Sequence, residues 1–187
     1  VTASHCVSLG MQEPARAREV ARAVADAGIG VVTLPQTNLY LQGRDATTRI
    51  PRGLTAIGEL RRAGVAVAGG GDNMRDPFNP MGSADPFETA MLLVVAGHLS
   101  PDDAYAAVSD EARVVLGRPP VRIQPGSPAD LVAIRGESLA DVLASRTQDR
   151  LVLRAGRPVA RTRVALEWLV TPSTSHSRAD GAEPPPC

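Results

Sequence analysis

His5 and Asp72 are the two residues whose types and positions best suit chemistry, because each follows a short apolar run. Residues 1–4 precede the histidine, and residues 65–68 with three glycines precede the aspartate. Catalytic side chains of parallel α/β barrels lie at the carboxyl ends of the strands, and glycines let the backbone approach a ligand closely. The pattern therefore predicts that an imidazole and a carboxylate meet over one rim of a parallel sheet.

These residues also have plainer interpretations. A single histidine is more often a packed or surface residue than a catalytic one, and Asp72 would also suit a turn or a helix cap. The glycines do not form a dinucleotide-binding fingerprint, because the spacing fails at Met74 and no helix begins there. We expect His98 to stand at the C-terminal end of a helix, and we exclude His176 because it lies in a polar tail.

The elements that would position the two residues follow an alternating order in the first part of the chain. Continuous apolar runs predict strands buried on both faces, and apolar residues at helical spacing predict amphipathic helices. The order β-α-β-α-β predicts parallel strands joined by right-handed crossovers. The predicted elements are strands at 1–4, 30–34 and 65–68, helices at 14–27 and 54–64, and a polar loop at 35–51.

The second part of the chain predicts helices and then a small β unit. Ser100 followed by a proline and two acids is a good helix N-terminus. We predict helices at 86–97 and 101–116, strands at 121–123 and 130–134 around the turn 125–127, and a hairpin of 151–154 with 157–159. The predicted domains are a barrel portion at 1–118, a β portion at 119–170 and a disordered tail at 171–187.

Composition excludes several classes of function. The net charge is zero and aromatic residues make up 3% of the chain, so the sequence offers neither a basic surface nor stacking platforms for nucleic acid. The two cysteines, at positions 6 and 187, form no metal or redox spacing. No apolar stretch is long enough to cross a bilayer and no signal peptide is present, so we expect a cytoplasmic protein without a membrane partner.

Four motifs in this order resemble cytosine deaminase of the amidohydrolase superfamily, and the resemblance covers nearly all of residues 1–165. It implies an α/β fold, the C-terminal part of a metal-dependent (β/α)8 TIM barrel, with the predicted strands as barrel strands six, seven and eight, plus part of a small β-sandwich. The motifs are Val1-Thr2-Ala3-Ser4-His5, Asn38-Leu39-Tyr40-Leu41-Gln42-Gly43-Arg44, Gly71-Asp72-Asn73 with Asp76-Pro77, and Gly126-Ser127-Pro128-Ala129-Asp130-Leu131-Val132.

The resemblance also implies residue roles. Asp72 would bind a divalent metal, iron or zinc, and carry a proton from the hydrolytic water, while His5 would contact that water or the tetrahedral intermediate. Gln42, Asn73 and Phe78 would lie near the substrate, although Phe78 equally suits packing within its loop. A bound cation lowers the pKa of water enough to supply hydroxide, and ammonia leaves. Because Asn73 replaces a frequent second acid, the substrate is open among cytosine, isocytosine, creatinine and similar amidine-like rings.

The chain lacks the other metal ligands that the resemblance requires, since only three histidines are present. A catalytic metal normally needs at least three protein ligands, so we expect that this chain alone binds no metal, releases no ammonia and is aggregation-prone or partly molten. The leading hypothesis is the C-terminal portion of a homo-oligomeric deaminase whose N-terminal half is missing. The alternatives are another cyclic amidohydrolase or aminohydrolase, a non-catalytic subunit of a split barrel, and a decayed gene product.

Overall fold

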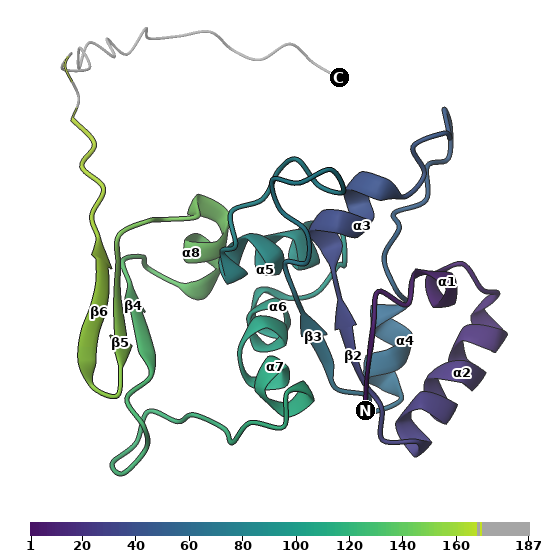
Figure 1. Cartoon of the computed structure of the whole chain (residues 1–187), viewed down its shortest axis with the longest axis horizontal. Helices are drawn as coiled ribbons and strands as arrows, with labels where there is room; N and C mark the ends of the chain where they lie inside the picture. The colour runs from purple at the N-terminus through teal and green to yellow at the C-terminus, as the bar shows by residue number, and fades with distance from the viewer. Residues whose placement is uncertain (168, 170–187) are drawn as a thin grey trace, which may run out of the picture.

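The computed structural model describes residues 1–167 and 169, which form two small sheets with helices packed around and between them (Figure 1). Among these residues no helix combines the length and the apolar character needed to span a bilayer. The first part contains β1 (Thr2–Ser4), α1 (Val7–Gly10), α2 (Pro14–Asp26), β2 (Gly30–Thr33), α3 (Pro35–Leu41), α4 (Ile57–Arg62), β3 (Val67–Gly69), α5 (Pro86–Val95), α6 (Pro101–Val108) and α7 (Asp110–Val115). The second contains β4 (Leu131–Ile134), α8 (Leu139–Ser145), β5 (Arg150–Arg154) and β6 (Arg157–Thr162).

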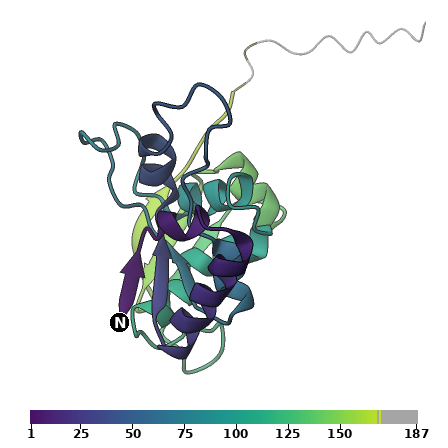
Figure 2. The same cartoon turned by 90° about the vertical axis from the view of Figure 1, so that its right-hand side faces the viewer.

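The first sheet is parallel, with β2 between β1 and β3. Its register pairs Ala3 with Val31 and Val31 with Val67, and Val31 and Val67 are each 1% exposed. Side chains alternate between the faces of a sheet, so these three residues share the face that the helices cover. A Cβ on Gly69, which shares this face, would touch Leu93 of α5. Figure 2 shows β1 and β2 on the left and the helices to their right.

The opposite face and both edges of this sheet have no strand partner among the described residues. By the same register Ser4, Val32 and Ala68 share this second face, and β1 and β3 are the two edge strands. The predicted parallel order of the three strands is confirmed. The closed barrel of the resemblance is not formed by the described residues, because three short strands cannot close on themselves.

An arginine joins the helices that cover the sheet. Arg61 of α4 donates from Nη1 to both carboxylate oxygens of Glu111 in α7 (2.7 and 2.8 Å) and from Nη2 to Asp103 in α6 (2.7 Å). Burial raises the pKa of Glu111, and the nearby Arg61 charge offsets this only in part. Arg61 therefore stabilises the charged form of Glu111, which is partly withdrawn from water between the helices.

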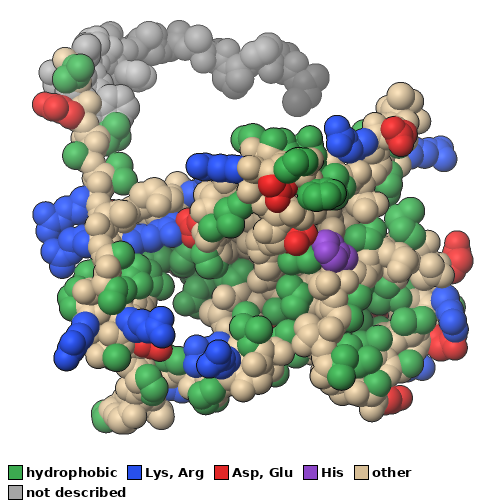
Figure 3. Space-filling view, viewed as in Figure 1, with side chains coloured by type: hydrophobic (Ala, Val, Ile, Leu, Met, Phe, Trp, Pro, Cys, Tyr) green, Lys and Arg blue, Asp and Glu red, His purple; other side chains and the backbone are tan. Residues whose placement is uncertain are grey.

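The second sheet is antiparallel, in the order β4-β5-β6, and it bears the arginines that Figure 3 shows gathered over this part of the molecule. Its edge strand β6 is exposed throughout and contains Arg157, Pro158 and Arg161. Charged residues and proline on an edge strand disfavour pairing with other chains. This agrees with the prediction of a small β unit after the helices.

A charged contact connects the second sheet to the helices of the first part. Arg150 of β5 lies 2.8 Å from Asp85, the N-cap of α5, and its guanidinium stacks 4.8 Å above the Phe87 ring. Burial tends to raise the pKa of Asp85, but hydrogen bonds from Arg150 and from the Phe87 amide, with the arginine charge, lower it below its ordinary value. Helix α8 strengthens the joint, because Val142 and Leu143 belong to the main hydrophobic core.

Several details differ from the sequence prediction. Residues 35–41, predicted as loop, form α3, because the buried side of this helix is polar and gives no apolar periodicity. Residues 121–123 form no strand; Arg122 instead pairs with Asp110 of α7 (3.1 Å). The helix predicted at 101–116 is broken at Ser109, whose hydroxyl donates to the Tyr105 carbonyl (2.7 Å).

Helices α1 and α8 were not predicted, although Ser138 caps α8 by accepting from the Asp141 amide (3.1 Å), a Ser-x-x-Asp signal visible in the sequence. His98 was also placed wrongly. It lies beyond the end of α5 with a φ of 56°, in contact with Arg52, rather than in the last turn of the helix. The predicted disordered tail at 171–187, with His176, lies outside the described residues.

We predict that Arg61→Met lowers the free energy of unfolding by about 1–3 kcal/mol, because two carboxylates lose their hydrogen-bond donor and Glu111 stays partly buried. Urea unfolding followed by circular dichroism measures the change. Arg22→Met, on the exposed side of α2, is the matched control and should change stability by less than about 0.5 kcal/mol. Equal effects of both variants would show that the hydrogen bonds of Arg61 to Glu111 and Asp103 do not stabilise the fold.

We also predict that Asp85→Asn flattens the dependence of stability on pH. A lowered folded-state pKa makes the carboxylate contribution fully present above the unfolded pKa of about 3.9, and this contribution is lost as pH falls through the lower folded-state pKa. Asparagine still caps α5. Unfolding free energies measured from pH 6 to pH 3 should therefore fall less steeply for Asp85→Asn than for the parent chain or for Asp26→Asn, an exposed control. Parallel curves for all three proteins would contradict this.

Candidate active site

His5 stands at the carboxyl end of β1, where the backbone turns sharply. Its amide donates to the Val32 carbonyl (3.0 Å), which continues the parallel pairing one residue past the strand. His5 and Cys6 both have positive φ, 63° and 48°, a conformation that few side chains adopt. The chain therefore leaves the sheet at this point and presents the imidazole at its rim, 45% exposed.

Asp72 reaches the same rim from β3 through a glycine stretch. The Gly70 amide donates to the Thr33 carbonyl (3.0 Å), so the backbone stays beside β2 after the strand ends. A Cβ on Gly70 would lie 2.8 Å from Leu34 Cδ2, a collision that glycine avoids. Asp72 itself has a φ of 56°, and its side chain is 25% exposed. The glycines thus let the loop pass close to β2 and turn the carboxylate inward.

The structure brings His5 and Asp72 together across the end of β2. Nε2 of His5 lies 3.7 Å from Oδ2 of Asp72, which is too long for a direct hydrogen bond. The predicted meeting of an imidazole and a carboxylate over one rim is therefore seen. A small polar atom between the two groups would be within reach of both.

The first turn of α3 holds this arrangement in place with three consecutive side chains, each at most 8% exposed. Gln36 exchanges hydrogen bonds with Thr89 of α5 (3.0 and 3.2 Å). Thr37 Oγ1 accepts from the Asn73 amide (3.1 Å) beside Asp72. Asn38 Oδ1 lies 2.9 Å from Nδ1 of His5. Through these contacts α3 binds the ring of His5, the loop that carries Asp72, and helix α5.

Asn38 and Thr37 contact the rim, and the sequence prediction did not select them as site residues. Both lie in or next to the motif that carries the resemblance, but the segment was predicted as a loop and only Gln42 was chosen from it. The available signal was topological, because residues directly after β2 must lie between the ends of β1 and β3.

Asn73 organises the loop after Asp72. Its Nδ2 donates to Asp76 Oδ2 (2.7 Å), and its carbonyl accepts from Asn79 Nδ2 (2.9 Å). The hydrogen bond from the Asn73 side chain, with those from the amides of Asn79 and Phe78, lowers the pKa of Asp76 against the opposing effect of desolvation. The side-chain amide of Asn73, predicted to contact substrate, is thus engaged within the loop.

Phe78 and Gln42, the other two residues predicted near a substrate, occupy peripheral positions. Phe78 is 60% exposed on the loop that Asn73 and Asp76 shape. Gln42 is exposed at the end of α3 and lies beside Gly53. A Cβ placed on that glycine would be only 2.4 Å from the Cβ of Gln42. No hydrogen bond or ion pair joins either side chain to His5 or Asp72 among the described residues, and their place near a substrate stays a prediction.

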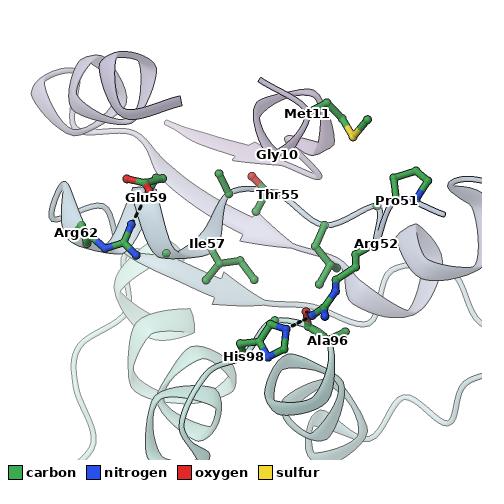
Figure 4. A pocket seen from close by; sticks show the side chains of 15 residues that line it. Gly10, Met11, Pro51, Arg52, Thr55, Ile57, Glu59, Arg62, Ala96 and His98 are labelled. Atoms are coloured by element: carbon green, nitrogen blue, oxygen red, sulfur yellow. Dashed lines mark hydrogen bonds and ion pairs between the residues drawn. The ribbon is translucent and has the colours of Figure 1, made fainter. Parts of the chain in front are cut away.

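A cavity of about 260 Å³ lies beside Asp72, between β3 and the start of α5. A larger hollow of about 500 Å³ lies elsewhere, between α1, the start of α4 and the end of α5 (Figure 4). Its charged groups already contact one another, Arg52 with His98 and Arg62 with Glu59 (2.6 Å). Neither His5 nor Asp72 lines this larger hollow, so the candidate site at the rim is separate from it.

The described residues do not complete a metal site. No group of three histidine, cysteine, aspartate or glutamate side chains is placed to hold a metal ion among them. At the rim, Asp72 and His5 supply one carboxylate and one imidazole, whereas a catalytic metal normally has at least three protein ligands. Residues 1–167 and 169 therefore do not fit a divalent cation by themselves.

Residues 1–160 match the model of the amidohydrolase family. This match covers most of the chain. The chain belongs to the amidohydrolase family. Its sequence is 41% identical over 167 residues to a pterin deaminase of Rhizobium rhizogenes, covering 87% of this chain and 38% of that protein. The family resemblance inferred from the four motifs is confirmed.

Solved amidohydrolase structures share the fold. 5-Methylcytosine deaminase from Klebsiella pneumoniae superposes with a TM-score of 0.77 at 25% identity, covering 90% of this chain and 42% of that one. N-isopropylammelide isopropylaminohydrolase from Burkholderia multivorans gives 0.72 at 32% identity, covering 86% and 39%. This amidohydrolase chain thus spans about two fifths of the length of the relatives it matches.

We predict that Thr37→Val loosens the loop that carries Asp72. The substitution removes the acceptor of the Asn73 amide while keeping the shape of a buried side chain. Losing one such bond costs about 1 kcal/mol, so the Asn73 amide should exchange with solvent deuterium about five- to tenfold faster. Thr48→Val, at an exposed position of the loop before α4, is the control. Unchanged exchange at Asn73 would show that Thr37 does not hold the loop.

Proposed function

We propose that this chain is the His5–Asp72 portion of a hydrolytic deaminase that acts on a nitrogen heterocycle with an exocyclic amine. The observation that carries the proposal is the 3.7 Å approach of Nε2 of His5 to Oδ2 of Asp72 at the carboxyl ends of parallel strands. Membership of the amidohydrolase family, with a pterin deaminase at 41% identity, supports hydrolysis of a carbon–nitrogen bond.

In this proposal Asp72 accepts a proton from the attacking water and returns it to the departing amine. A carboxylate 25% exposed at a rim can exchange protons with a bound reactant while remaining shielded from bulk water. His5 holds the same water, or the oxygen that it becomes, through Nε2. Because His5 and Asp72 are both fixed on backbone turns at the ends of strands, they lower the entropic cost of bringing the reactants together.

Asp72 is also proposed as one ligand of a divalent iron or zinc ion. Since the described residues supply too few ligands for such an ion, the remaining ones come from outside residues 1–167. The parallel sheet supports this, because among the described residues neither β1 nor β3 pairs with a further strand on its outer side. A polypeptide that completes the sheet would therefore also complete the site.

Cytosine, 5-methylcytosine and pterins share a ring carbon that carries an amine and is flanked by a ring nitrogen. We propose a substrate of this chemical class. The named activities of the relatives, pterin deaminase and 5-methylcytosine deaminase, support the class, while the 41% identity favours a pterin over cytosine as the first compound to assay. The alternative within the family is an aminohydrolase that releases a substituted amine, as the name of the Burkholderia enzyme indicates.

We predict that Asp72→Asn abolishes deamination in the polypeptide encoded by the complete reading frame around Val1. Loss of the proton-transferring carboxylate should lower kcat by at least about 10²–10⁴-fold, measured as ammonia released from pterin, 5-methylcytosine and cytosine. Asp110→Asn, at an exposed ion pair of α7, is the matched control and should retain activity.

The present chain, assayed alone with added zinc or iron, should release no ammonia. Clear turnover by the isolated chain would contradict the requirement for further ligands. A fully active Asp72→Asn protein would contradict the role of the carboxylate.

A further inference from the structure

The buried side-chain amide of Asn38 contacts the imidazole ring of His5. Its side chain is 2% exposed, and its carbonyl Oδ1 lies 2.9 Å from Nδ1 of the partly exposed His5. Its Nδ2 has no hydrogen-bond partner among the described residues. The contact with His5 is thus the polar contact that accounts for an amide at this place in α3.

A buried amide with an unpaired donor costs free energy, about 1–3 kcal/mol by general experience. Leucine has the same number and branching of side-chain heavy atoms and would avoid that cost. The neighbouring residues of α3, Gln36 and Thr37, have their hydrogen bonds satisfied by Thr89 and Asn73. Asn38 therefore differs from them in serving a ring nitrogen of the candidate site rather than the packing of the helix.

We propose that Asn38 is a positioning residue that fixes His5 in the Nδ1–H tautomer. Because Oδ1 can only accept, the hydrogen of the bond must come from Nδ1 of the ring. A neutral imidazole carries one proton, so Nε2 then presents a lone pair on the side facing Asp72. This deepens the proposed function, on which its catalytic meaning rests, by assigning the proton on the ring.

The consequence is a pair of acceptors at the rim. Nε2 of His5 and Oδ2 of Asp72, 3.7 Å apart, would both accept, and one molecule with two hydrogens to donate, such as water, could satisfy them together. The opposite tautomer would place a donor at Nε2. A direct hydrogen bond from Nε2 to Asp72 would then compete with the bound water. The amide orientation of Asn38 thus decides what the rim can bind.

A rotated amide is the rival arrangement. With Nδ2 toward His5, Nδ1 would accept and Nε2 would carry the proton. Rotation would leave Oδ1 unpaired in place of Nδ2, so the count of unsatisfied atoms does not separate the two arrangements. The position of the proton on the His5 ring separates the two arrangements, and it can be observed directly.

The test is long-range proton–nitrogen NMR of the full chain labelled with nitrogen-15, at a pH where the His5 ring is neutral. The His5 signals are identified by their loss in His5→Gln. We expect Nδ1 to resonate as a protonated ring nitrogen and Nε2 as an unprotonated one. Asn38→Leu should shift the tautomer ratio by about tenfold toward Nε2–H, the effect of losing one hydrogen bond. Asn38→Asp keeps an acceptor but adds a negative charge that favours the protonated ring, so its spectrum is recorded at a pH where that ring is also neutral, and Nδ1 should again carry the proton.

A parent chain with the proton on Nε2 would overturn the proposal, and so would an unchanged ratio in a folded Asn38→Leu chain. Should Asn38→Leu not fold, the parent and Asn38→Asp spectra decide, since loss of the Nδ1–H form in Asn38→Asp also contradicts it. The readout needs no turnover. A correct tautomer in a protein without deaminase activity would therefore remove the proposed function and leave the role of Asn38 standing.

Discussion

The first turn of α3 is the structural constraint on which the rest of the site depends. Gln36, Thr37 and Asn38 are buried and reach three different places, the helix behind the sheet, the loop of Asp72 and the ring of His5. A single helical turn advances only about 5.4 Å, so these contacts fix the rim residues within one small region. Without this turn, the ends of β1 and β3 would carry their side chains on separate and independently mobile loops.

The remainder of the fold supports that turn from one side. The helices cover one face of the parallel sheet and pack through apolar residues such as Leu60 and Leu93, neither of which is exposed. Arg61 binds carboxylates of two further helices, and Arg150 attaches the antiparallel sheet to the start of α5. On the other side, no further strand pairs with β1 or β3 or packs on the second face of the parallel sheet among the described residues.

The three parallel strands were predictable from sequence and α3 was not, for a physical reason. Residues 30–34 are apolar because β2 is central in the sheet, and such a run identifies itself by hydrophobicity alone. The buried side of α3 instead carries Gln36, Thr37 and Asn38, whose partners are polar groups far away in sequence. A helix with a polar buried face leaves no periodic signal, so the segment that organises the site was predicted as a loop.

The sequence by itself determined the order of parallel strands, the family and the two residues at the strand ends, because these depend on local apolar runs and on motifs read along the chain. Tertiary structure decided that His5 and Asp72 stop 3.7 Å apart and that Asn38 binds the ring. It also decided that Asn73 binds within its own loop and that Gln42 and Phe78 are exposed. Such outcomes depend on hydrogen bonds between residues more than thirty positions apart or on the course of a loop, and neither spacing nor composition encodes them.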